Sequence, residues 1–208
     1  MSFETPPPAK DRRVRRTRAA LLGAAVTLVS ARGTANVPIS DIADAAGVSR
    51  QLVYLHFRDR DNLLLEAALD LARRELADPL EDAPAEAVGR ERALVVARHF
   101  AEHRGFYRAM FEAASGFALN RVICGLLAPL RSGSLKARFG HKLPPQAADD
   151  LAVFITGGGT ALLSAWVSSP DEPLDPEAMA DRLLAVGQIL TTALATLDRS
   201  AEVPAQRD

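Results

Sequence analysis

The chain has 208 residues, of which 48% are hydrophobic and 25% charged, a composition that indicates a globular protein with a real core and excludes a disordered chain. A single cysteine excludes a disulfide within the chain and suits the cytoplasm, and neither a signal peptide nor an apolar run long enough to span a membrane is visible. Net charge is −1, but residues 1–60 hold ten Lys or Arg against five Asp or Glu, which favours a nucleic-acid-binding front on an acidic body.

The first helix is expected from about Asp11 to Ala31, with Gly33 ending it. Its apolar stripe is formed by Leu21, Leu22, Ala25, Leu28 and Val29. Arg12, Arg13 and Arg16 lie away from that stripe. They could form an ordinary solvated helix end, but a basic cluster beside the motif described next favours contacts with DNA phosphates.

Residues 38–60 predict two short helices joined by a tight turn. Ser40 is expected to cap the first helix, and Gly47 to end it in the left-handed conformation that glycine adopts freely. The inward positions of this helix are expected at Ile42, Ala45 and Ala46. The small residues Ala43, Ala45, Ala46 and Gly47 let the two helices approach closely.

The second short helix is expected to be capped by Ser49. Its inner side is predicted to carry Leu52, Val53 and Phe57, and its outer side Arg50, Gln51, Tyr54 and Arg58. A short helix that presents such polar and aromatic side chains to solvent is typical of a DNA-reading helix-turn-helix. The alternative for the hairpin alone is a plain pair of helices in an all-α core.

Residues 17–66 resemble the DNA-binding domain of the tetracycline-repressor (TetR) family. The resemblance is carried by Ile42-Ala43, Ala46-Gly47-Val48-Ser49, Leu52-Val53-Tyr54-Leu55-His56-Phe57 and Arg58-Asp59-Arg60-Asp61-Asn62-Leu63-Leu64. Two positions depart from the family pattern: Arg60 stands where a lysine is usual, and Leu52 where a small or hydroxyl residue is frequent.

Base contacts are predicted for Arg50, which can pair with both guanine acceptors, and for Gln51, which can pair with adenine. The resemblance implies phosphate contacts for Tyr54, His56 and Arg60. Ser40, Ser49 and Arg58 complete the expected DNA-binding set.

Asp59 is expected to cap a helix of about residues 60–77, which the resemblance identifies as the link that moves the DNA-binding head when a ligand binds. A proline-bounded linker should follow at 78–87. The expected division is a head at 10–58, a linking helix at 59–77 and an effector-binding and dimerisation domain at 78–200. Disordered tails are expected at 1–9 and 201–208.

Residues 88–112 predict one or two helices, and five of the eleven aromatic residues fall between positions 100 and 117. Apolar walls with a few polar groups are typical of a ligand site. The candidate lining residues are Phe100, His103, Arg104, Tyr107, Met110, Phe111 and Phe117. For each aromatic taken alone, ordinary core packing is the competing interpretation.

A metal site is not expected. His99 and His103 are four residues apart on a helix, and His141 is a third histidine, but no neighbouring Cys, Asp or Glu completes a ligand set. No cofactor is expected either.

Residues 113–143 are expected to form a helix broken by glycines and Pro129, followed by long helices at about 146–168 and 177–197. In the TetR family two such final helices form a four-helix dimer interface; the alternative is that they only close the core of one chain. The candidate interface residues are Leu151, Phe154, Ile155, Leu162, Trp166, Leu183, Val186, Leu190 and Leu194.

The sequence thus predicts an all-α protein, in which a three-helix DNA-binding domain precedes a larger helical ligand-binding and dimerisation domain. The expected function is that of a cytoplasmic, homodimeric, ligand-responsive regulator, a repressor of a palindromic operator that a small apolar or aromatic effector releases. An enzyme would need a nucleophile with a base, paired carboxylates or a metal set, and no such constellation is visible. A protein-interaction adaptor built on the same helices would ignore DNA.

Overall fold

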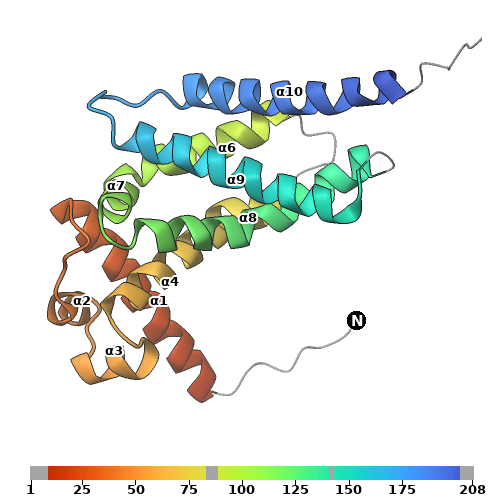
Figure 1. Ribbon diagram of the computed structural model, residues 1–208. Helices are drawn as coiled ribbons and strands as arrows, with labels where there is room; N and C mark the ends of the chain where they lie inside the picture. The colour runs from red at the N-terminus through yellow and green to blue at the C-terminus, as the bar shows by residue number, and fades with distance from the viewer. Residues whose placement is uncertain (1–8, 83–88, 141–142, 202–208) are drawn as a thin grey trace, which may run out of the picture. The chain divides into compact units, whose positions relative to one another are not determined.

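The structure of the protein is a computed structural model that describes residues 9–82, 89–140 and 143–201 (Figure 1). Every regular element in these ranges is helical, which confirms the all-α fold class. Residues 1–8 and 202–208, which make up most of the two expected tails, lie outside the described residues, as does His141.

The helices gather into two compact units. The first unit consists of residues 1–72 and 103–119, and the second of residues 73–102 and 120–208. Residues 103–119 belong to the first unit, although the sequence predicts them to be part of the C-terminal domain. The reason is that α7 (Arg104–Glu112) packs against α1 (Ala9–Arg32). At Gly105 a Cβ atom would lie 3.1 Å from the Ser30 carbonyl oxygen, so glycine allows this close approach. The functional bounds 10–58, 59–77 and 78–200 remain a prediction.

In the first unit, α1 and α4 (Arg60–Ala72) pack side by side. The side chains buried at this contact include Leu21, Leu22, Ala25, Val29, Leu63, Leu64, Ala67, Ala68 and Leu71. Gly33 ends α1 as predicted: its φ is 62°, and its N–H donates to the Val29 carbonyl at 2.9 Å. Asp59 caps α4 as predicted, because its Oδ1 accepts from the Asn62 N–H at 2.8 Å.

The second unit begins with η1 (Arg73–Ala77), a π-helical segment, followed by α5 (Asp78–Asp82) and α6 (Gly89–Glu102). The expected linker at 78–87 is therefore wrong for residues 78–82, and residues 83–88 lie outside the described part. Residues 60–82 are helical without a break, and Pro79 follows directly on the π-helical segment, where the backbone hydrogen-bond pattern already departs from that of an α-helix. The region 88–112 resolves into two helices, α6 and α7.

Residues 116–139 form one continuous helix, α8 (Gly116–Phe139), so the prediction of a helix broken at its glycines and at Pro129 is wrong. Helix propensity is a weak preference that packing overrides. Here Leu119, Ile123, Leu135 and Phe139 are buried, while Pro129 is exposed.

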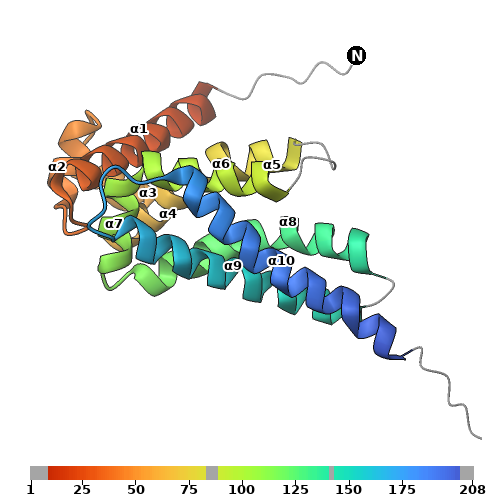
Figure 2. The same ribbon diagram turned by 90° about the horizontal axis from the view of Figure 1, so that it is seen from above.

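Two long helices complete the second unit, α9 (Pro145–Val167) and α10 (Pro176–Ala201), close to their predicted bounds. Figure 2 shows α10 running beside α6, and three ion pairs join these helices. Arg90 contacts Asp181 at 2.8 Å and Glu177 at 2.9 Å, and Arg98 contacts Glu177 at 3.0 Å.

Among the described residues, one helical stretch, Gln146–Val167 of α9, is long and apolar enough to cross a membrane by length and composition alone. The sequence expectation that no segment could do so is therefore corrected. One third of the apolar window in this helix is buried within the protein.

Candidate DNA-binding site

A tight turn joins α2 (Ile39–Ala45) to α3 (Arg50–His56) and depends on Gly47, whose φ is 66°. Its N–H donates to the Asp44 carbonyl at 3.1 Å, and the next N–H, from Val48, donates to the Ala43 carbonyl at 3.0 Å. These bonds satisfy carbonyl groups at the end of α2 that have no partner within the helix. The predicted role of Gly47 is confirmed.

The start of α2 differs from the prediction. Pro38 occupies the N-cap position, without a side-chain capping bond, and the Ser40 hydroxyl instead donates to Asp41 Oδ1 at 3.1 Å. The capping role predicted for Ser40 is therefore wrong, because the helix begins two residues earlier than a cap at Ser40 requires. The inward positions also shift: Ile42 is buried as expected, but Ala45 is exposed.

An ion pair between Arg32 and Asp41, 2.7 Å long, ties the end of α1 to α2. The Arg32 guanidinium and, to a smaller extent, the Ser40 hydroxyl stabilise the carboxylate, and they lower the pKa of Asp41 below its ordinary value of 3.8. A charged link therefore positions α2 against α1.

Ser49 caps α3 as predicted, because its hydroxyl accepts from the Leu52 N–H at 3.3 Å. The inner side of α3 is formed by the buried Val53 and Phe57, with Leu52 half-buried. Arg50, Gln51 and Tyr54 are exposed on the outer side of α3, and Arg58 is exposed just beyond the end of the helix. The hairpin therefore presents the predicted base-contacting residues to solvent.

Leu55 is 76% exposed on the same side of α3 as Gln51, four residues earlier. Leu55 is not among the residues predicted to contact DNA. A signal was available, because an apolar residue that falls outside the inner stripe of an amphipathic helix must face solvent.

The residues predicted to contact phosphates differ in their exposure and in their side-chain partners. Arg12, Arg13 and Arg16 are exposed on α1. His56 is half-buried, as its place on the helix suggests. Arg60 is held on the surface by two partners, because it donates to Asn36 Oδ1 and contacts Asp61 Oδ1 at 3.3 Å.

Arg18, which the sequence analysis missed, joins α1 to the end of α3 and to α4. Its guanidinium lies 4.7 Å from the centre of the Phe57 ring, donates to the His56 carbonyl at 3.3 Å and pairs with Glu66. Its signal in the sequence is weak, since it is one more arginine in a basic cluster. The structure assigns it to holding α3.

Residues 21–67 match the family described as bacterial regulatory proteins, tetR family. The matched stretch contains all of α2 and α3, the Gly47 turn and the first half of α4. The chain therefore contains a TetR-family DNA-binding domain at residues 21–67. It is accordingly a DNA-binding transcriptional regulator, which confirms the expectation of a regulator and not an enzyme.

Solved structures share the fold of this chain. A tetR-family transcriptional regulator from Streptomyces coelicolor is 22% identical, with a TM-score of 0.60, over 92% of this chain and 91% of that one. The dihydroxyacetone kinase operon activator DhaS is 16% identical, with a TM-score of 0.58, over 83% and 97% of the two chains. The repressor AlkX from Dietzia sp. strain DQ12-45-1b is 22% identical, with a TM-score of 0.52, over 84% and 95%. The comparison with curated proteins gives no match.

The aromatic candidates for effector binding do not share one environment. Phe100, Tyr107 and Met110 are fully buried, and the Tyr107 ring lies 6.3 Å from that of Phe111. Phe117, in contrast, is 81% exposed. The expectation that Phe117 lines an enclosed cavity is therefore wrong. For His103, Arg104 and the buried members, a ligand-binding role remains a prediction.

No carboxylate was expected near the histidines, and for His99 this expectation is wrong. Its Nδ1 lies 3.0 Å from Glu75 Oε2, and the His99 side chain is only 3% exposed. Glu75 belongs to η1, and π-helical turns are rare and shift side chains relative to a regular α-helix. The pair is distant in sequence, so spacing alone could not reveal it.

The candidates for a dimer surface are divided. Phe154 and Val186 are exposed on α9 and α10, and Leu151, Ile155, Leu162, Leu183 and Leu190 are half-buried. Trp166 is buried within its own chain, so its predicted place on a dimer surface is wrong. The side chain of Leu194 lies outside the described part of the structure.

Proposed function

We propose that this TetR-family protein is a cytoplasmic homodimer that represses transcription by binding a palindromic operator, and that a small apolar or aromatic effector releases it. The observation that carries the proposal is the outer side of α3, where Arg50, Gln51 and Tyr54 are exposed while Val53 is buried. A helix fixed in this way can enter a major groove, and these side chains can reach base edges and phosphates.

The base contacts follow from side-chain chemistry. Arg50 pairs with guanine O6 and N7, and Gln51 with adenine N6 and N7. Leu55 adds an apolar contact with a thymine methyl group, because it continues the same side of the helix. The remaining candidates bind DNA phosphates and set the register of the helix in the groove. They are Tyr54, His56, Arg58 and Arg60, together with Ser40, Ser49 and the arginines of α1.

Dimerisation is supported by the outer surface of the second unit. From Val153 onward the exposed positions of α9 recur at helical spacing and form one uncharged stripe: Val153, Phe154, Gly158, Ala161 and Ala165. On α10, Val186 is 46% and Ile189 69% exposed. Apolar surface of this kind is typical of protein interfaces. A dimer would place two α3 helices on half-sites roughly 34 Å apart.

Release by an effector requires that the effector binds the DNA-free form more tightly than the DNA-bound form. The buried aromatic residues of the predicted site support an apolar or aromatic effector. The direction of regulation is a separate proposal. Among proteins that share the fold, AlkX is named a repressor and DhaS an activator.

The test is binding to the DNA directly upstream of the protein's own coding region, measured by fluorescence anisotropy over a range of salt concentrations. Arg50→Ala should cost about 1–3 kcal/mol and relax the preference at one base position. Arg60→Ala should weaken binding to all sequences alike and reduce the salt slope by about 1. Arg121→Ala, which removes an exposed arginine of α8, is the matched control and should bind as the wild type does.

The two arginine variants distinguish the roles. Equal affinity of the wild type and both variants for the DNA would refute the site assignment. A loss of base preference in Arg60→Ala, with a uniform loss in Arg50→Ala, would exchange the two roles.

A further inference from the structure

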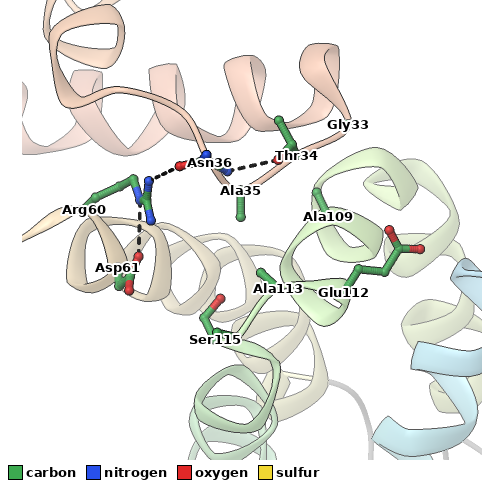
Figure 3. Close-up of a pocket in the computed structure, with 11 residues that line it drawn as sticks. Gly33, Thr34, Ala35, Asn36, Arg60, Asp61, Ala109, Glu112, Ala113 and Ser115 are labelled. Atoms are coloured by element: carbon green, nitrogen blue, oxygen red, sulfur yellow. Dashed lines mark hydrogen bonds and ion pairs between the residues drawn. The ribbon is translucent and has the colours of Figure 1, made fainter.

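A pocket of about 320 Å³ lies within the first unit, close to the helix-turn-helix (Figure 3). Its walls come from the α1–α2 loop (residues 33–36), the first turn of α4 (60–61) and the end of α7 with its connection to α8 (109 and 112–115). This volume is at the lower end of the range of small-molecule sites. None of the aromatic residues predicted to bind an effector lines it.

The charged groups of the pocket wall already have counter-ions. The Arg60 guanidinium contacts Asp61 at 3.3 Å, and the Glu112 carboxylate accepts from Arg108 at 2.9 Å. A charged ligand would have to compete with one of these pairs and give up its own hydration. An uncharged ligand avoids both costs.

The remaining wall combines small apolar groups with hydrogen-bonding groups. Ala35 and Ala109 are buried, so their methyl groups form an apolar floor. Thr34 and Ser115 carry hydroxyl groups, and the Thr34 hydroxyl accepts from the Asn36 N–H at 3.1 Å. Figure 3 shows Ala35 and Ser115 approaching from different segments, the loop on one side and the connection to α8 on the other.

We propose that this pocket binds a compact, uncharged molecule with hydroxyl or carbonyl groups on one side and an apolar ring or short chain on the other. The apolar part would rest on the alanine methyl groups, and the polar part would bond to Thr34, Ser115 and the Asn36 amide. This site is separate from the aromatic effector site predicted from the sequence.

The pocket also bears on DNA binding, in a step that rests on the proposed function. Arg60 is a phosphate candidate, yet its guanidinium donates to Asn36, which is another part of the wall. A ligand that binds Asn36 and fills the adjoining space stabilises the arrangement in which Arg60 is held by Asn36 and Asp61. By linkage, such a ligand weakens DNA binding, and DNA weakens binding of the ligand by the same factor.

The binding step is tested on the full chain by NMR, following backbone amide resonances. The probe is cis-1,2-cyclohexanediol, with cyclohexanecarboxylate and cyclohexylammonium as charged analogues of similar size. The diol should produce saturable shifts at residues 33–36 and 112–115. Ala113→Leu, which adds bulk to the wall, should abolish them, while Ala137→Leu, the same change at an exposed alanine of α8, should leave them intact.

Ser115→Ala provides a second variant that changes the pocket wall without adding bulk. It should lower the affinity of the protein for the diol. The proposal of a site is overturned if the diol gives no saturable shifts, or if Ala113→Leu and Ser115→Ala both bind it as the wild type does. The proposed ligand class is overturned if either charged analogue saturates at a lower concentration than the diol.

The regulatory step is tested separately with operator DNA. Saturating diol should weaken DNA binding at least about fivefold in the wild type and leave the affinity of Arg60→Ala unchanged. Equal weakening of both proteins would overturn the role of Arg60. Failure of the proposed function would instead appear as no specific DNA binding at all, with the NMR shifts retained.

Discussion

The turn between α2 and α3 allows a sharp test, because Gly47 has a φ of 66° and no heavy atom lies within 4 Å of the place where a Cβ would stand. Gly47→Ala therefore creates no clash, and its whole effect is the backbone strain of an alanine in the left-handed region. That strain costs about 1–2 kcal/mol. Gly47→Asn should cost less, because asparagine tolerates this conformation better.

Gly23 provides the matched control. It lies in the middle of α1 and is exposed, and no heavy atom lies within 4 Å of the place where its Cβ would stand, but its φ is not positive. Gly23→Ala should stabilise the protein by about 0.5–1 kcal/mol, since alanine loses less conformational entropy in a helix. Urea unfolding of the three variants measures these differences. Equal effects of alanine at the two positions would refute the reasoning about the turn.

Three further predictions concern single contacts. Ser49→Ala should destabilise the protein by about 1 kcal/mol in urea unfolding, because the Leu52 N–H loses its capping partner; an unchanged midpoint would show that the cap contributes nothing. Phe154→Asp should convert the proposed dimer to a monomer in light scattering, and an unchanged mass would place the interface elsewhere. The pKa of Asp41 is lowered on folding, so its ion pair contributes stability above pH 3.8 that is lost as the pH falls through the lower folded value. Arg32→Ala should return the NMR-measured pKa toward 3.8.

The helix-turn-helix could be predicted well because its signals are local. Gly47, Ser49 and Asp59 each determine a helix end through their own backbone or a bond three residues away. The inner and outer sides of α3 follow from the helical period alone. The errors in this region are small shifts along α2: the N-cap is Pro38 and not Ser40, and the buried alanine is Ala43 and not Ala45.

The rest of the chain was predicted less well because its structure depends on distant partners. Pro129 and the glycines of α8 are unfavourable in a helix taken alone, and the helix persists because Ile123, Leu135 and Phe139 are buried. The contact of His99 with Glu75 joins residues 24 positions apart through a π-helical segment, which no periodic pattern predicts. The pocket near Arg60 likewise draws on three separate segments.

Helix α9 is apolar on two sides, and the two sides have different physical causes. Its buried positions, Ala148, Ala152, Thr156, Thr160, Leu163 and Val167, recur at intervals of three or four residues and pack within the second unit. The exposed positions on its other side are also uncharged from Val153 to Ala165, and for this reason the helix meets the criteria for a membrane span.

The second apolar side of α9 has another explanation in a chain with a TetR-family DNA-binding domain. At Gly158 no heavy atom lies within 4 Å of a Cβ position, so a neighbouring helix could approach the backbone closely there. Flanking apolar side chains such as Phe154 could then interlock with those of a partner. We infer that one side of α9 is apolar because it belongs to the core, and the other because a second copy of the chain covers it.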